Sequence, residues 1–83
     1  MKRIGKRIKE IRLEQGLSQQ KFGERLLVSQ DTVSLWEQGK SVPTTEVLIT
    51  MATQFDYSVD YILCLKEYEL WKNAAKLRRF MLG

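Results

Sequence analysis

Residues 16–40 read GLSQQKFGERLLVSQDTVSLWEQGK, and this stretch decides the fold. Ser18 and Ser29 lie eleven residues apart, and each hydroxyl can accept an unpaired backbone N–H from the first turn of a helix. Only Leu27 and Val28 then remain to connect the two helices. The stretch therefore predicts two short helices joined by a tight turn.

The two predicted helices share a buried seam. Phe22 and Leu26 are four residues apart and form the apolar stripe of the first helix. The second helix runs over residues 30–38, with Val33 and Trp36 turned inward, while its other face is polar. Such a pair is a helix-turn-helix, in which the first helix braces the second so that its polar face can enter the major groove of DNA.

Helices are also predicted on both sides of this pair. Ile4, Ile8 and Ile11 share one face of a helix that ends at Gly16, a position that suits a left-handed cap. Residues 40–43 form a loop, because Pro43 disfavours helix at the residue before it. A fourth helix begins after a cap at Thr44 or Thr45 and buries Leu48, Met51, Ala52 and Phe55.

Ser58 caps a fifth helix, with Tyr61 and Ile62 as core residues. No stretch alternates with a period of two, so we expect no strands and an all-α fold of five helices. Residues 66–82 predict one more amphipathic helix, whose apolar stripe needs a cover, either from another chain or by folding back onto the first and fifth helices of its own chain. The expected division is a DNA-binding domain over residues 1–65 and a C-terminal dimerisation or partner-binding element over residues 66–83. The stripe consists of Leu70, Trp71, Ala74, Leu77, Phe80 and Met81.

Charge is divided unevenly along the chain. Residues 1–43 hold nine Lys or Arg against five Asp or Glu, residues 44–65 hold three acids and no base, and residues 66–83 hold five bases against two acids. A basic first half beside an acidic middle is typical of a protein with one face for a polyanion, although solvated basic helices are also common.

Catalysis and metal binding are not expected. The chain has no histidine, and its single cysteine, Cys64, permits neither an internal disulfide nor a zinc site of the usual Cys/His kind. We expect no cofactor. The basic N-terminus lacks the apolar stretch of a signal peptide, and no apolar run could span a bilayer, so the expected location is cytoplasmic.

Over about residues 2–64 the chain strongly resembles the Xre/Cro-type helix-turn-helix regulators of the lambdoid phage repressors. The motifs that carry the resemblance are Gly16-Leu17-Ser18-Gln19, Phe22-Gly23, Val28-Ser29-Gln30, Val33 to Lys40, and Leu48, Ala52 and Phe55 followed by Ser58 to Leu63. The resemblance implies a repressor-like five-helix bundle that binds double-stranded DNA.

The resemblance also assigns roles to residues. The base-reading positions are Gln30, Asp31, Ser34 and Leu35. Gln30 can bond adenine, Asp31 can accept from cytosine N4, and Leu35 can touch a thymine methyl. Asp31 is equally explained by the helix dipole. The positions that face phosphate are Ser18, Gln19, Ser29, Thr32, Gln38, Lys40 and Ser41, and Arg12 and Glu37 match an ion pair between the first helix and the end of the third.

Two residues depart from the family pattern. Gly23 stands where the family has Ala, so we expect Gly23→Ala to stabilise its helix by up to about 1 kcal/mol. Leu27 stands where the family has Gly, and a positive φ at leucine is uncommon.

The expected function is a repressor that binds a palindromic operator as a homodimer. The alternative is an antitoxin or adaptor, in which residues 66–82 hold another protein while the helix-turn-helix serves autoregulation. Self-association favours the repressor, and a co-purifying partner favours the alternative.

Overall fold

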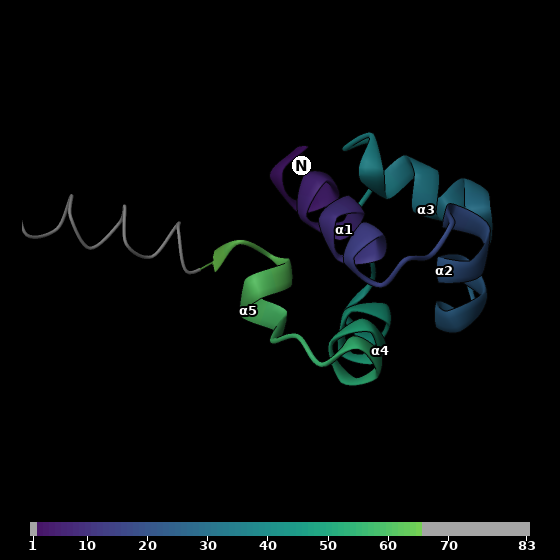
Figure 1. The fold of residues 1–83 in the computed structure, drawn as a ribbon. Coiled ribbons are helices and arrows are strands. Elements are labelled where there is room, and N and C mark those ends of the chain that lie inside the picture. The colour runs from purple at the N-terminus through teal and green to yellow at the C-terminus, as the bar shows by residue number, and fades with distance from the viewer. Residues whose placement is uncertain (1, 66–83) are drawn as a thin grey trace, which may run out of the picture.

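A computed structural model describes residues 2–65 and shows five helices in that part of the chain. Their bounds are α1 Lys2–Glu14, α2 Gln19–Leu26, α3 Gln30–Glu37, α4 Thr45–Phe55 and α5 Val59–Ile62 (Figure 1). No strand occurs between residues 2 and 65. The all-α prediction is confirmed, and the predicted helix over residues 66–82 lies outside the described residues.

Four helices begin at the predicted caps. Ser18, Ser29 and Ser58 each accept the backbone N–H three residues later at 3.1 Å, and Thr44 does the same at 3.3 Å. Each cap residue is extended while the next residue is helical, so the hydroxyl satisfies a donor that has no partner within the helix. Between Thr44 and Thr45, the structure selects Thr44.

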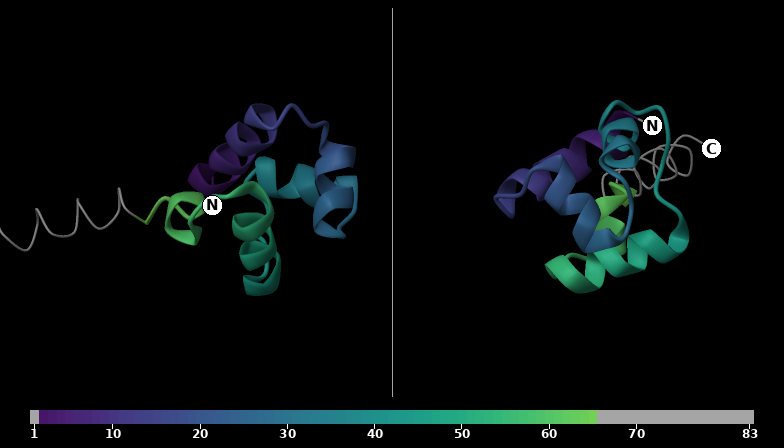
Figure 2. Two further views of the ribbon diagram at one scale, coloured as in Figure 1. Left: turned by 60° about the horizontal axis from the view of Figure 1, so that its bottom comes forward. Right: turned by 90° about the vertical axis from the view of Figure 1, so that its right-hand side faces the viewer.

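The helices pack so that α3 lies against α1 and α2. Helix α4 contacts α2 and α5, and α5 also contacts α1 (Figures 1 and 2). In Figure 1 and in the left view of Figure 2, α5 and α2 lie on opposite sides of the described part of the chain. The rings of Phe22 and Phe55 stack at 5.2 Å between centroids where α2 meets α4. The core residues are Ile4, Ile8, Ile11, Phe22, Leu26, Val33, Trp36, Leu48, Met51, Phe55 and Ile62.

One core prediction is wrong. Tyr61 is 38% exposed, because α5 turns Ile62 inward and leaves Tyr61 on the outer side of the helix. The Tyr61 ring stacks on Tyr57, and the Arg7 guanidinium lies 4.1 Å from the Tyr61 ring centroid. Tyr61 therefore helps to hold α5 on α1 from the outside. Ala52 is only half-buried and packs at the edge of the core.

Two glycines permit close contact between backbones. A β-carbon on Gly23 would lie 2.6 Å from the carbonyl oxygen of Val28, and one on Gly5 would lie 2.1 Å from the carbonyl oxygen of Trp36. Both distances are shorter than a β-carbon can tolerate. This contact opposes the expected stabilisation by Gly23→Ala, because the gain in helix propensity would have to offset a displacement of the backbone. Gly5 allows the backbones of α1 and α3 to approach closely, and Gly23 allows the same between α2 and the turn that follows it.

The turn between α2 and α3 is closed by a left-handed leucine. Leu27 has φ 59° and ψ 38°, and its N–H bonds the carbonyl of Glu24. The N–H of Val28 bonds the carbonyl of Gly23 at 2.9 Å. Leu27 is 92% exposed. Burial of its side chain therefore does not offset the energetic cost of the left-handed backbone conformation.

Candidate nucleic-acid interface

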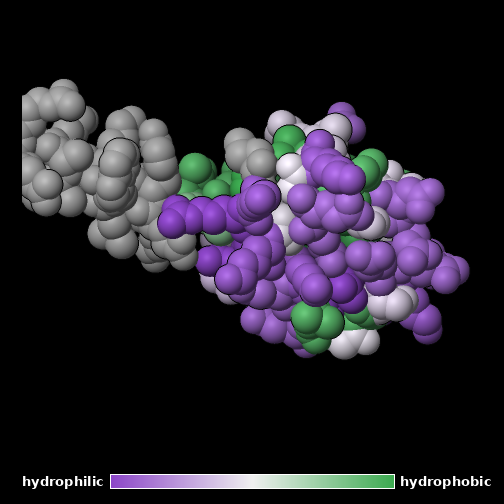
Figure 3. All heavy atoms as spheres, turned by 90° about the horizontal axis from the view of Figure 1, so that it is seen from above, coloured by the Kyte–Doolittle hydropathy of each residue, from purple (hydrophilic) through white to green (hydrophobic). Residues whose placement is uncertain are grey.

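Helix α3 is divided into a buried face and an exposed face. Val33 and Trp36 are 0% and 3% exposed and fix the helix to the core. The four predicted base-reading residues share the opposite side, where Gln30, Asp31 and Leu35 are exposed and Ser34 is partly exposed. Seen from the side on which α3 lies, the surface is mostly hydrophilic, with a few scattered apolar side chains (Figure 3). Leu35, at 42% exposure, adds an apolar contact to this polar face.

Hydroxyl groups gather at the N-terminus of α3. Ser29 Oγ accepts from Thr32 N at 3.1 Å and lies 2.9 Å from Thr32 Oγ1. Ser18 occupies the corresponding place at the start of α2. The N-terminus of a helix carries partial positive charge and unpaired N–H groups, so both ends suit a phosphate.

A shielded ion pair anchors the other end of α3. Arg12 of α1 makes a two-pronged contact with Glu37, with Nε to Oε2 at 2.7 Å and Nη2 to Oε1 at 3.0 Å. The two side chains are 11% and 6% exposed. The remaining guanidinium nitrogen, Nη1, donates to the carbonyl of Leu17 at 2.9 Å. The expected pair is present, and it ties α3 to α1 and to the loop before α2.

Gln19 joins this network from the start of α2. Its Nε2 donates to Glu37 Oε1 at 3.3 Å. Because a carboxylate can only accept, this contact fixes the amide with its nitrogen toward Glu37, and the second N–H of the same nitrogen stays available. Gln19 can thus present a donor to an anion while it braces α3.

The loop after α3 supplies further polar groups. Gln38, Lys40 and Ser41 are all exposed. A β-carbon on Gly39 would lie 3.1 Å from the Cα of Lys2, so the start of α1 abuts this loop and places a second exposed lysine beside it. Proximity to the loop favours a phosphate contact by Lys2.

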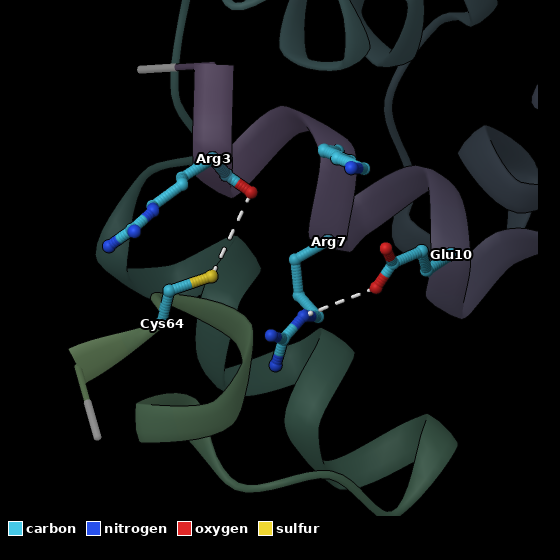
Figure 4. A pocket seen from close by; sticks show the side chains of 5 residues that line it. Arg3, Arg7, Glu10 and Cys64 are labelled. Carbon is cyan, nitrogen blue, oxygen red and sulfur yellow. Dashed lines mark hydrogen bonds and ion pairs between the residues drawn. The ribbon is translucent and has the colours of Figure 1, made fainter. Parts of the chain in front are cut away.

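Arg7 has a structural role, because it links α1 to α5. Its Nη1 donates to the carbonyl of Tyr61 at 2.9 Å, and its Nε lies 3.4 Å from Glu10 Oε2. Beside it, Arg3, Lys6 and Cys64 line an open pocket of about 230 Å³ between α1 and the end of α5 (Figure 4). The Cys64 thiol is buried and lies 3.7 Å from the carbonyl oxygen of Arg3.

A second polar contact also holds α5 against α1. The Tyr57 hydroxyl donates to the carboxylate of Glu14 and accepts a weaker bond from Gln15 Nε2 at 3.4 Å. The bond to Glu14, and secondarily burial, raises the pKa of Tyr57 above its ordinary value. This group serves the attachment of α5 and is not part of the α3 surface.

Two features of the interface escaped the sequence analysis. Gly5 fits against the carbonyl oxygen of Trp36, yet an isolated glycine inside a helix gives no signal of what it touches. Gln38 Nε2 donates to Ser34 Oγ at 2.7 Å, and their spacing of four residues could have indicated it. The predicted dimer or partner residues lie outside the described residues: Leu70, Trp71, Ala74, Leu77, Phe80 and Met81.

The exposed face of α3 offers donors, acceptors and one apolar side chain, flanked by two helix N-termini and a loop with lysine. In the described part of the chain, no cluster of three or more potential metal ligands occurs, and no helix is long and apolar enough to cross a membrane. The arrangement suits a groove edged by phosphates better than a small molecule.

Comparison with known proteins agrees with a surface that suits DNA. The helix-turn-helix family model matches residues 8–62. The HTH-type transcriptional activator BcrR of Enterococcus faecalis is 29% identical over 86 residues, which cover 96% of this chain and 42% of that protein. The HTH-type transcriptional regulator ImmR of Bacillus subtilis (strain 168) is 32% identical over 60 residues, which cover 72% of this chain and 47% of that protein. The chain thus spans less than half the length of these two relatives.

Among solved structures, the P22 c2 repressor in complex with a synthetic operator superposes with a TM-score of 0.67 at 29% identity. The superposition covers 71% of this chain and 89% of that repressor. The family match includes all of α2, α3 and α4, and therefore the whole α3 surface. The chain belongs to the helix-turn-helix family of Xre/Cro type, whose members are non-enzymatic, DNA-binding transcriptional regulators.

Proposed function

We propose that this protein is a repressor that binds a palindromic operator as a homodimer, with α3 in the major groove. The observation that carries the proposal is the exposed face of α3, held at one end by the Arg12–Glu37 pair and at the other by the close contact at Gly23. Such a helix presents its base-reading side chains without having to fold on binding. A cytoplasmic location belongs to the same proposal, because the operator lies there.

The proposed base contacts are those of Gln30, Asp31, Ser34 and Leu35. Phosphate contacts come from Ser18, Gln19, Ser29, Thr32, Gln38, Lys40 and Ser41. Support comes from the polar exposed surface and from the N-termini of α2 and α3, whose dipoles favour a neighbouring anion. The likeness to a repressor crystallised on an operator adds to this. The relative named as an activator makes the direction of regulation a matter for experiment.

Two variants test base reading against phosphate binding. Gln30→Ala should weaken binding to the selected operator by roughly 1–3 kcal/mol and leave binding to random DNA nearly unchanged, because it removes a base contact. Lys40→Ala should weaken binding to all sequences and lower the slope of log affinity against log salt by about one per bound subunit. Fluorescence anisotropy over a salt series measures both. Equal losses on operator and random DNA for Gln30→Ala would contradict its role.

We propose that residues 66–83 are a separate element and that residues 66–82 supply the dimer contact. The support is the apolar stripe in the sequence, together with the buried core that described residues form between Ile4 and Ile62. Pairing would set two copies of α3 roughly 34 Å apart, one turn of DNA, and would require a two-fold symmetric site.

Truncation after Lys66 tests the dimer contact. The shortened chain should be monomeric by light scattering, should bind a single half-site with unchanged affinity, and should lose the gain in affinity on the full palindrome. An unchanged oligomeric state would refute the contact. Transcription in vitro from a promoter that overlaps the selected operator then separates repression, in which the transcript falls, from activation, in which it rises.

A further inference from the structure

One hydroxyl on the exposed face of α3 is already engaged by its own helix. Gln38 Nε2 donates to Ser34 Oγ at 2.7 Å. A serine hydroxyl has one hydrogen to donate and two lone pairs, and this contact takes one lone pair. Thr50 and Thr53 of α4 give their hydroxyl hydrogens to the carbonyl four residues earlier. Among residues 2–65 Ser34 makes no such bond, so its hydrogen is available to a ligand.

We propose that Gln38 sets Ser34 as a hydrogen-bond donor and thereby determines which base Ser34 accepts. A hydroxyl that donates selects the acceptor atoms of the major groove, which are purine N7, guanine O6 and thymine O4. The second lone pair of Ser34 could accept from the amino groups of cytosine N4 and adenine N6, but the serine hydrogen would then have no acceptor on the base, so these groups are disfavoured. The inference rests on the proposed function, in which α3 lies in the major groove. Ser34 is then a specificity-determining residue, and Gln38 is a positioning residue.

The surroundings of Gln38 favour the same orientation of its amide. Gln38 is the C-cap residue that follows α3, and it precedes the exposed Lys40 and Ser41, where a phosphate is proposed to bind. A phosphate oxygen accepts only, so it requires an amide N–H. The amide nitrogen carries two hydrogens, one for Ser34 and one for the phosphate. The reversed amide would turn its carbonyl oxygen toward Ser34 and force the serine to give up its hydrogen.

The carboxylate nearest in sequence does not compete for this amide. Both oxygens of Glu37 are taken by Arg12, and Oε1 also accepts from Gln19. The Gln38 amide is therefore free to serve Ser34, and the donor character of Ser34 follows from a contact within one helix turn.

Selection of binding sites from random DNA tests the inference with five proteins in parallel: the full chain, Ser34→Ala, Gln38→Glu, Gln38→Met and the charge control Gln54→Glu. At one base pair of each half-site the full chain should prefer an acceptor base. Ser34→Ala should flatten the preference there by roughly 3- to 10-fold, the effect of one neutral hydrogen bond. Gln38→Met should weaken the preference at the same base pair, because methionine has no N–H to donate to Ser34 Oγ and the hydroxyl is then free to rotate.

Gln38→Glu should reverse the preference. A carboxylate can only accept, so Ser34 would donate to it and present a lone pair outward, which favours cytosine N4 or adenine N6. Gln54→Glu adds the same charge on α4 and should leave the preference at this base pair unchanged. Replacement of the selected purines by their 7-deaza analogues, measured by anisotropy, then shows whether N7 is the acceptor. Far-UV circular dichroism and thermal unfolding establish that each variant is folded.

Each outcome decides. Unchanged preferences in Ser34→Ala would overturn the base contact. A Ser34-dependent preference for cytosine or adenine amino groups in the full chain would overturn the proposed orientation. Equal losses on all sequences for both Gln38 variants would leave Gln38 only a phosphate contact. If the full chain selects no sequence, the proposed function itself fails. If Gln30→Ala loses base preference and Ser34→Ala does not, only the present inference fails.

Discussion

Breaking the ion pair between Arg12 and Glu37 should destabilise the protein far more than removing the pair altogether. The two side chains are 11% and 6% exposed, so water reaches either charge poorly once its partner is gone. In Glu37→Leu, the guanidinium keeps only the carbonyl of Leu17 among its present partners. In Arg12→Met, the carboxylate keeps only the bond from Gln19. Each single substitution leaves a shielded charge without compensation.

The expected magnitudes follow from this geometry. Each single substitution should lower the free energy of unfolding by about 3–5 kcal/mol, while the double variant loses both charges and should cost much less. The coupling free energy should therefore be at least about 2 kcal/mol. A loss of 3 kcal/mol in a domain of this size corresponds to a fall in Tm of roughly 12–24 °C. Urea titration near 10 °C, where stability is near its maximum, keeps the single variants folded enough to measure.

The chain contains a matched control for this cycle. Arg7 and Glu10 also form an ion pair, at 3.4 Å and three residues apart on α1, but the Glu10 side chain is 48% exposed. The cycle of Arg7→Met and Glu10→Gln should give a coupling below about 0.5 kcal/mol. A value that small for Arg12 and Glu37 would refute the reasoning and place their pair among weak surface contacts. The double variant, if folded, is also the protein in which to measure operator binding without the anchor.

Two backbone predictions follow from the turn between α2 and α3. Gly23→Ala should lower the free energy of unfolding by about 1–3 kcal/mol, because its β-carbon would lie 2.6 Å from the carbonyl oxygen of Val28; a stabilised variant in urea titration would show that the turn relaxes freely. Leu27→Gly should raise the free energy of unfolding by up to about 1 kcal/mol, because φ is 59° and the exposed side chain gives up no burial. Gly16→Ala is the converse control, with φ 68° and open space around the new methyl group, and should destabilise by a similar amount. Equal unfolding midpoints for Leu27→Gly and the parent chain would show that the left-handed leucine is not strained.

Local signals explain why so much of the fold could be predicted. A cap depends on a hydroxyl and on the N–H three residues later, so Ser18 and Ser29 mark their helices from sequence alone. The core stripe of α1 follows in the same way from the spacing of Ile4, Ile8 and Ile11. The prediction that Tyr61 is a core residue was wrong because Tyr61 and Ile62 are adjacent and both apolar in a short helix. Only packing against α1 decides which of the two turns inward.

The exposed residues of α3 were predicted by their register with the buried ones, but the contacts among them were not. Sequence distinguishes the face of Val33 from the face of Gln30, because those faces differ in polarity. The sequence does not show that the Gln19 amide donates to Glu37, since these residues are eighteen positions apart. The close contact at Gly23 escaped prediction for the same reason. Helix propensity is a local property, whereas the carbonyl of Val28 reaches Gly23 only after the turn has folded.

The two ends of α3 are fixed by different kinds of contact, and the residues that fix them are distinct from the proposed base-reading residues. At the start, the close contact of Gly23 with Val28 and the cap at Ser29 set the angle at which the helix leaves the turn. At the end, Glu37 is held by Arg12 and Gln19. None of these residues belongs to the proposed base-reading set. With the proposed base contacts, substitutions at Gln30 or Leu35 should therefore change which sequence is bound while the free energy of unfolding changes little.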